Sequence, residues 1–245
     1  MKKQDGKFEM AVDYPIKDKY NIEDLLEIMR ILRAPGGCPW DAEQNHETIK
    51  KNLIEETYEV IEAVNKEDTE LLKEELGDVL LQVVFHAAME EEKGVFSFSD
   101  VADGICKKLI ERHPHVFGDI KVSGTDDVLT NWDAIKRNSK KQKTTTDAME
   151  SVPRELPALM RAAKLQSKAA KAGVEVNGDV SAYVAEKASA EISEKSVGEL
   201  LFAVCAAARQ NDIDPEEALT KVSDEFLSSF GAYEKSVDKN FSLYK

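Results

Sequence analysis

Apolar residues recur at helical spacing along most of the chain, and no stretch of useful length alternates as a half-buried strand does. In the first half this spacing predicts helices at about residues 21–34, 44–65, 69–93 and 100–112. Only a few residues separate the second helix from the third, so we expect these two to pack as an antiparallel hairpin. The sequence therefore predicts an all-α fold.

Acidic residues stand within the apolar faces of this predicted hairpin. Glu56 and Glu75 interrupt those faces, and Glu59 and Asp78 follow one turn later on the same sides. An unpaired buried carboxylate is destabilising, whereas a hard divalent cation prefers oxygen ligands of this kind. A solvated, Glu-rich helix pair would show the same residues, so the pattern alone leaves both interpretations open. Glu55 could serve a second ion or act as a base.

The apolar pattern also predicts which side chains form the core. The buried face of the third helix is expected to comprise Leu72, Leu76, Val79, Leu80, Val83 and Val84. Trp40 lies in the loop PGGCPWD and could either plug the core or line a binding site. The plug is favoured, because buried aromatic side chains are the commoner case.

Cationic and aromatic partners for an anionic ligand occur further along the chain. Lys108 and Arg112 are one helical turn apart, as are Trp132 and Lys136. Lysine and arginine suit phosphate oxygens, and Trp132 could lie against a base or ribose. Ordinary surface charge and a core tryptophan are the alternative interpretation of each pair.

Composition excludes several classes of function. The net charge of −14 and pI near 4.9 argue against a sequence-independent nucleic-acid binder, which needs a basic footprint. A bound divalent cation would still admit an anionic small molecule. The three cysteines form no CxxC pair, which argues against a disulfide framework or a cysteine zinc site. The charged N-terminus and the lack of a long apolar run predict a cytoplasmic protein without a membrane partner.

The second half shows features of the first half in the same order. LPALMR at 156–161 is similar to LLEIMR at 25–30, and GELLFAVCAAA at 198–208 is similar to GDVLLQVVFHAA at 77–88. Such similarity predicts a tandem duplication of one helical domain. The predicted divisions are a first domain at 20–140, a linker at 141–155 and a second domain at 156–245.

These motifs together resemble the MazG family, within the all-α NTP pyrophosphatase superfamily. The family motif EExxE, a spacer and ExxD is present as EETYE at 55–59 and ELGD at 75–78. The flanking segments GGCPWDAEQNHETI, GDVLLQVVFHA, KLIERHPHVFGD and NWDAIK agree as well. The resemblance covers about residues 20–140.

The resemblance implies Mg²⁺-dependent hydrolysis of a nucleoside triphosphate to the monophosphate and pyrophosphate, with Mn²⁺ as an alternative ion. It also implies a homodimer of helical bundles and a role in clearing non-standard or excess nucleotides. The metal ligands it implies are Glu56, Glu59, Glu75 and Asp78, with Glu55 as a further catalytic residue. The nucleotide contacts it implies are Lys108, Arg112, Trp132 and Lys136.

The second half departs from the family pattern at these positions. The EExxE position reads EKASA at 186–190, and the ExxD position reads SVGE at 196–199. Glu225 and Ser229 stand where the family has a lysine and an arginine. We therefore expect activity in the first domain and a degenerate site in the second. The alternatives are a nucleotide-binding regulatory protein without turnover and a helical scaffold without a ligand.

Overall fold

Helices make up nearly all of the regular structure. The computed structural model describes residues 3–4, 7–8, 14–125, 127–128, 131–132, 135, 144–174 and 179–237. The exception to the helices is a short antiparallel strand pair, β1 (Lys3–Gln4) with β2 (Lys7–Phe8). The predicted all-α class is therefore confirmed. The chain divides into two compact units, Met1–Val122 and Ser123–Lys245, which are described separately below.

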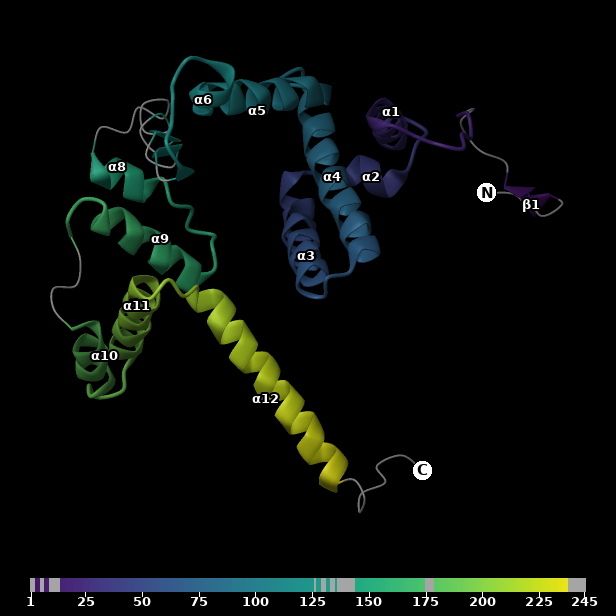
Figure 1. The fold of residues 1–245 in the computed structure, drawn as a ribbon. Coiled ribbons are helices and arrows are strands. Elements are labelled where there is room, and N and C mark those ends of the chain that lie inside the picture. Colours follow the sequence, from purple (N-terminus) through teal and green to yellow (C-terminus); the bar gives the residue numbers. More distant parts are fainter. Residues whose placement is uncertain are drawn as a thin grey trace. The chain divides into compact units, whose positions relative to one another are not determined.

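The helices of the first unit begin and end close to the predicted positions (Figure 1). They are α1 (Ile22–Arg33), α2 (Pro39–Glu43), α3 (His46–Asn65), α4 (Thr69–Glu92), α5 (Phe98–Arg112) and α6 (Pro114–Phe117). The side chains of Asn21, Asn45, Asp68 and Ser97 accept hydrogen bonds from the first-turn amides of α1, α3, α4 and α5. Such caps satisfy amides that lack a partner within the helix, which is why the helices begin there.

The α3–α4 hairpin is the longest paired feature of the first unit, and its turn is short. The chain reverses over Lys66, Glu67 and Asp68, and Glu67 has a positive φ of 53°. The Asp68 amide donates to the Ala63 carbonyl at 3.1 Å, which closes the end of α3. Figure 1 shows the two helices side by side. The predicted antiparallel hairpin is thus confirmed in this unit.

The core lies toward the end of the hairpin that is remote from its turn. Its buried members come from α1, α3 and α4: Met29, Ile49, Val84, Phe85, Ala88 and Met89. Arg33 fastens the α1 end of this core, since its guanidinium binds both carboxylate oxygens of Glu92, at 2.5 and 2.8 Å. The same guanidinium donates to the Asp41 carbonyl at 2.6 Å. The loop between α1 and α2 needs glycine at Gly37, where a Cβ would lie 2.2 Å from the Ile31 carbonyl oxygen.

Several apolar side chains that the sequence predicts to be buried are exposed. Leu76 is 52% exposed and Leu80 38%, because α3 and α1 leave one side of α4 uncovered. Trp40 is 58% exposed on α2, so the core plug predicted for it is wrong. Periodicity identifies an amphipathic helix but does not say how much of its apolar face one chain can cover. No helix of the described residues combines the length and apolar character needed to cross a membrane.

The second unit is also helical. Its helices are α8 (Thr145–Glu150), α9 (Ala158–Ala170), α10 (Val180–Ala188), α11 (Glu194–Gln210) and α12 (Pro215–Val237). Helices α10 and α11 form a second hairpin, which packs against α9. Helix α8 lies within the segment predicted to be a linker, and there Ala148 and Val152 are buried. The described residues from 125 to 135 are helical.

Candidate functional site

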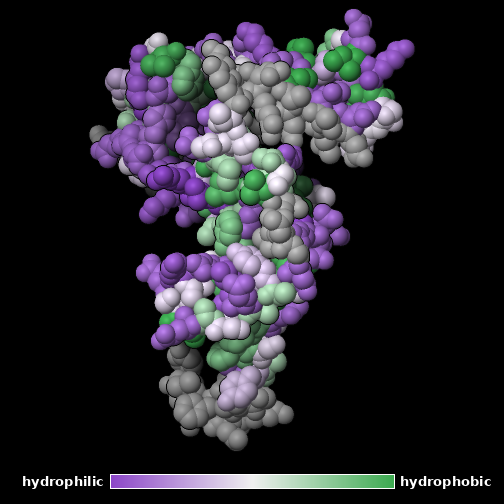
Figure 2. Space-filling view, turned by 90° about the vertical axis from the view of Figure 1, so that its left-hand side faces the viewer, coloured by the Kyte–Doolittle hydropathy of each residue, from purple (hydrophilic) through white to green (hydrophobic). Residues whose placement is uncertain are grey.

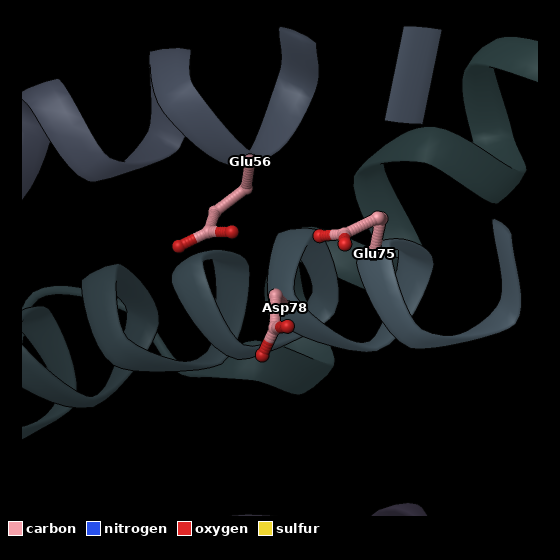
Figure 3. Close-up of side chains that lie close together, drawn as sticks. All are labelled: Glu56, Glu75 and Asp78. Carbon is pink, nitrogen blue, oxygen red and sulfur yellow. The ribbon is translucent and has the colours of Figure 1, made fainter. Parts of the chain in front are cut away.

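Three carboxylates from both arms of the α3–α4 hairpin point toward one another. Glu56 comes from α3, and Glu75 and Asp78 come from successive turns of α4 (Figure 3). One oxygen of each lies within 4.8 Å of the others, and the side chains are partly buried. The antiparallel register thus brings together residues that are about 20 positions apart in the sequence.

Burial and neighbouring negative charges raise the pKa of two members of this cluster. Burial is the main cause that raises the pKa of Glu56, followed by a hydrogen bond with the Glu59 side chain and the charge of Asp78. Burial likewise raises the pKa of Glu75, with further contributions from the charges of Glu59 and Asp78. Every charge that shifts either group is negative. Among the described residues, no positive charge is therefore found to offset these carboxylates.

The donor set fits a hard divalent cation. All ligand atoms in the cluster are carboxylate oxygens, which Mg²⁺ and related ions prefer over nitrogen or sulfur. A divalent ion would also remove the repulsion that raises the pKa of Glu56 and Glu75. Glu59 is exposed but lies close enough to hydrogen-bond with both of these side chains. Chemistry and geometry therefore agree on a metal-binding cluster.

The other predicted site residues of the first unit are not members of the three-carboxylate cluster. Glu55 is exposed on α3 and is not a member of the cluster. Lys108 is exposed and Arg112 is half-buried on α5, which leaves from the C-terminal end of α4 (Figure 1). Neither cation is among the charges that shift the pKa of Glu56 or Glu75.

Two further predicted nucleotide contacts fall in the second part of the chain. Trp132 is half-buried, at a helical residue of the unit Ser123–Lys245. Lys136 lies outside the described residues. The roles predicted for both stay predictions.

The second hairpin carries a lysine near its remaining carboxylates. Lys187, on α10, has its Nζ 3.5 Å from a Glu199 carboxylate oxygen on α11 and 3.4 Å from one of Glu186. The Nζ also lies 5.5 Å from the centre of the Tyr183 ring. Within the described residues of this unit, no group of three metal-ligating side chains occurs. An ammonium group therefore accompanies Glu199 where the first hairpin has only acids.

Sequence reasoning missed a second polar contact in the first hairpin. His46 begins α3, and its Nδ1 lies 2.7 Å from Nδ1 of His86 on α4. The other ring nitrogen of His46 lies 2.6 Å from a Glu90 carboxylate oxygen. The spacing of His86 and Glu90, one turn apart, is visible in the sequence, but their partner 40 residues earlier is not. This contact fixes the register of the hairpin at the end remote from its turn.

Comparisons with known proteins agree with this geometry. The model of the MazG nucleotide pyrophosphohydrolase domain matches residues 44–117, which include all of the predicted metal ligands. A nucleoside triphosphate pyrophosphohydrolase of Escherichia coli (strain K12) is 40% identical over 231 residues, covering 88% of each chain. The nucleoside triphosphate pyrophosphohydrolase/pyrophosphatase MazG of Thermotoga maritima is 39% identical over 229 residues, 89% of this chain and 87% of that protein.

A third relative is longer. The uncharacterized protein YabN of Bacillus subtilis (strain 168) is 44% identical over 239 residues, 91% of this chain. The chain spans about half of that protein, 49% of its length. The similarity thus extends over both units in relatives of comparable length and in one with additional sequence.

Proposed function

This chain belongs to the MazG family of nucleoside triphosphate pyrophosphohydrolases, and we propose that its first unit performs the hydrolysis with Mg²⁺. The observation that carries the proposal is the convergence of Glu56, Glu75 and Asp78 from two helices, with no compensating cation among the described residues. A triphosphate is itself an anion and would be repelled by three carboxylates. A divalent ion between them resolves that repulsion and explains why acids replace apolar residues in the hairpin.

In the proposed reaction, a water oxygen bonds to the α phosphorus while the bond from that phosphorus to the bridging oxygen breaks. The products are the nucleoside monophosphate and pyrophosphate. Bound Mg²⁺ would neutralise phosphate charge and lower the pKa of a coordinated water. Glu56, Glu75 and Asp78 would hold the ion, and Glu59 would complete the set from the exposed side. Glu55 is the candidate for a second ion or for proton abstraction.

Phosphate and nucleoside contacts are proposed for the remaining residues that the family motif contains. Lys108 and Arg112 would bind phosphate oxygens, which suits an ammonium and a planar guanidinium. Trp132 and Lys136 would contact the nucleoside and the phosphates. We propose the chain as a tandem pair of MazG-like domains, in which the second has lost its site. The contact between Lys187 and Glu199 supports that proposal, since a lysine accompanies the carboxylate and no group of three metal-ligating side chains is found in the described part of this unit.

A homodimer is proposed as the active assembly. Apolar side chains that α5 leaves exposed support it, because Val101, Ile105 and Leu109 recur at four-residue spacing and each is more than a third exposed in the single chain. Figure 2 shows apolar residues, in green, reaching the surface on one face of the molecule. The cytoplasmic location and the role in removing unwanted nucleotides stay predictions.

The test is pyrophosphate release from a panel of nucleoside triphosphates with Mg²⁺, on the full chain and two variants. Glu56→Gln should lower the rate by at least about a hundredfold, since metal-supplied charge stabilisation amounts to several kcal/mol. The matched control Glu199→Gln, in the second hairpin, should leave the rate unchanged. Equal loss in both variants would contradict the assignment to the first unit.

The regulatory alternative gives a different result in the same experiment. A sensor would bind nucleotide and gain thermal stability, yet it would release no pyrophosphate above the background. A scaffold would show neither effect.

A further inference from the structure

Gln82 is a buried polar residue of α4 that the folded first unit does not explain. It is 6% exposed, and its Oε1 has no hydrogen-bond partner among the described residues. A buried acceptor without a donor has lost its hydrogen bonds to water and has gained none within the protein. Such a group destabilises the fold unless another molecule binds it.

Gln166 in the second unit shows what a structural glutamine looks like in this protein. It is 8% exposed, and although its Oε1 likewise lacks a partner among the described residues, its Nε2 donates to the Phe202 carbonyl at 2.7 Å, which ties α9 to α11. Within the part of the chain that the structure describes, no comparable hydrogen bond ties Gln82 to a neighbouring helix. The packing role that accounts for Gln166 therefore does not account for Gln82.

The position of Gln82 connects it to the carboxylate cluster. It lies seven residues after Glu75 and four after Asp78 on the same helix. With 3.6 residues per turn, Glu75 and Asp78 project from α4 about 60° apart when the helix is viewed along its axis. Gln82 projects between these two directions. It is therefore on the side of α4 that faces α3, roughly 6 Å along the helix from Asp78 and away from the hairpin turn.

Helix α3 carries one amide and one apolar side chain at this level. The proximity of Glu56 to Asp78 and of His46 to His86 fixes the register of α3 against α4 at two points. Between these points, α3 presents Asn52 and Leu53, both half-buried, at the level of Gln82. Gln82 therefore lies between the acidic cluster and the apolar core along the hairpin.

This arrangement matches the order of groups in a nucleotide. If the phosphates lie at the carboxylates, the sugar follows through a single CH₂–O unit, within about one helical turn, whereas the base lies beyond it. A carboxamide can rotate about its last torsion, which is broad and roughly twofold, and so present its oxygen or its NH₂ group. A sugar hydroxyl can both donate and accept.

Resting on the proposed function, we propose that the Gln82 carboxamide hydrogen-bonds to a hydroxyl of the nucleotide sugar and so sets the sugar specificity of the site. The unpaired acceptor of the free protein then gains a donor when the substrate binds. Gln82 is thereby a specificity-determining residue adjacent to the metal-binding side chains.

The test compares wild type with Gln82→Met, which removes the carboxamide and keeps the length of the side chain. Binding of non-hydrolysable α,β-methylene analogues with ribose, 2′-deoxyribose and 3′-deoxyribose is measured calorimetrically in the presence of Mg²⁺. Wild type should bind one deoxy analogue about tenfold more weakly than the ribose analogue, as expected for one hydrogen bond. Whichever deoxy analogue loses affinity identifies the hydroxyl.

Gln82→Met should bind all three analogues with equal affinity and should keep or raise the thermal stability of the free protein. The matched control Gln166→Met should retain the wild-type preference. The inference is overturned if Gln82→Met discriminates as wild type does, or if wild type does not discriminate. Absence of nucleotide binding by wild type would instead overturn the proposed function, and this inference with it. Should Gln82→Met fail to fold, Gln82→Asn, which shortens the carboxamide, replaces it with the same expectation.

Discussion

At the scale of single residues, the acidic side chains of the first hairpin lower the stability of the fold but suit the proposed function. The pKa of Glu75 is raised by its burial and by the neighbouring carboxylates, so its ionised form is less favourable in the folded chain than in the unfolded one. The same oxygen atoms are the ones that suit a divalent cation. A site that binds metal well is therefore a weak point of the metal-free protein.

This conflict predicts that Glu75→Gln stabilises the metal-free protein. The folded state binds the Glu75 proton more tightly than the unfolded state, so wild-type stability falls as pH rises through the raised pKa. The advantage of Glu75→Gln should therefore be full at pH 8 and vanish as pH falls to where the wild-type carboxyl is protonated. Thermal unfolding with chelator, from pH 5 to 8, measures it.

With excess Mg²⁺ the order should reverse, because only wild type keeps the full ligand set. Glu111→Gln, on the exposed surface of α5, makes the same charge change away from the cluster and should show neither effect. A Glu75→Gln protein that is less stable than wild type in chelator at pH 8 would show that the carboxylates do not repel one another as described.

At the scale of elements, helix ends and the hairpin could be predicted from the sequence, because local chemistry determines them. Asn21 and Asp68 cap α1 and α4, which begin within one residue of the predicted positions. The acidic residues that interrupt an apolar face likewise indicated the cluster, since helical spacing alone places Glu75 and Asp78 on one side. The sequence does not predict features that depend on packing between segments far apart in the chain. Neither the pairing of His46 with His86 nor the unpaired Gln82 follows from spacing along one helix.

The extent of burial was the poorest prediction, for a related reason. Leu76 and Leu80 continue the apolar face of α4, but α3 and α1 cover only part of that face. Trp40 is a large aromatic residue of the kind often found in cores, but it lies on the short helix α2 and is exposed there. A sequence pattern shows that a side chain is apolar, whereas the neighbours that cover it depend on the tertiary structure and the assembly.

Two glycines of the hairpin region predict opposite effects of the same substitution. Gly77 lies inside α4, where an added Cβ would meet no atom within 4 Å. Gly77→Ala should therefore raise the free energy of unfolding by about 0.5–1 kcal/mol through helix propensity. Gly94 lies just after the C-terminal end of α4 and has a φ of 69°, which an L-residue with a side chain rarely adopts. Gly94→Ala should therefore lower the free energy of unfolding by about 1 kcal/mol.

Urea unfolding of the two variants measures both changes, and each serves as the control for the other. A loss of stability in Gly77→Ala would contradict the open space seen in the single chain, and would place another chain against α4 at this residue.

At the scale of the whole molecule, the single chain leaves a stripe of apolar side chains exposed to solvent. The stripe on α5 is the clearest case, with Ile105 45% exposed at its centre. Isolated exposed apolar residues need no explanation, whereas a continuous stripe marks a surface that another molecule covers.

The proposed homodimer predicts that wild type sediments as a dimer and that Ile105→Asp weakens it. Burying one isoleucine stabilises by about 1.5–3 kcal/mol, so the dissociation constant should rise at least tenfold. Analytical ultracentrifugation over a range of concentrations measures the change. Ile192→Asp, at an isolated residue that is 89% exposed in the second unit, should leave it unaltered. A wild-type monomer at all concentrations would refute the dimer.

The ammonium of Lys187 has a consequence for how the chain depends on its surroundings. A metal ion is borrowed from the medium and leaves when its concentration drops, whereas a lysine is part of the polypeptide and is always present. With the proposed ion, the first hairpin would depend on the supply of divalent cations around it. The ion pair of Lys187 with Glu199 needs no such supply, because both of its charges belong to the chain.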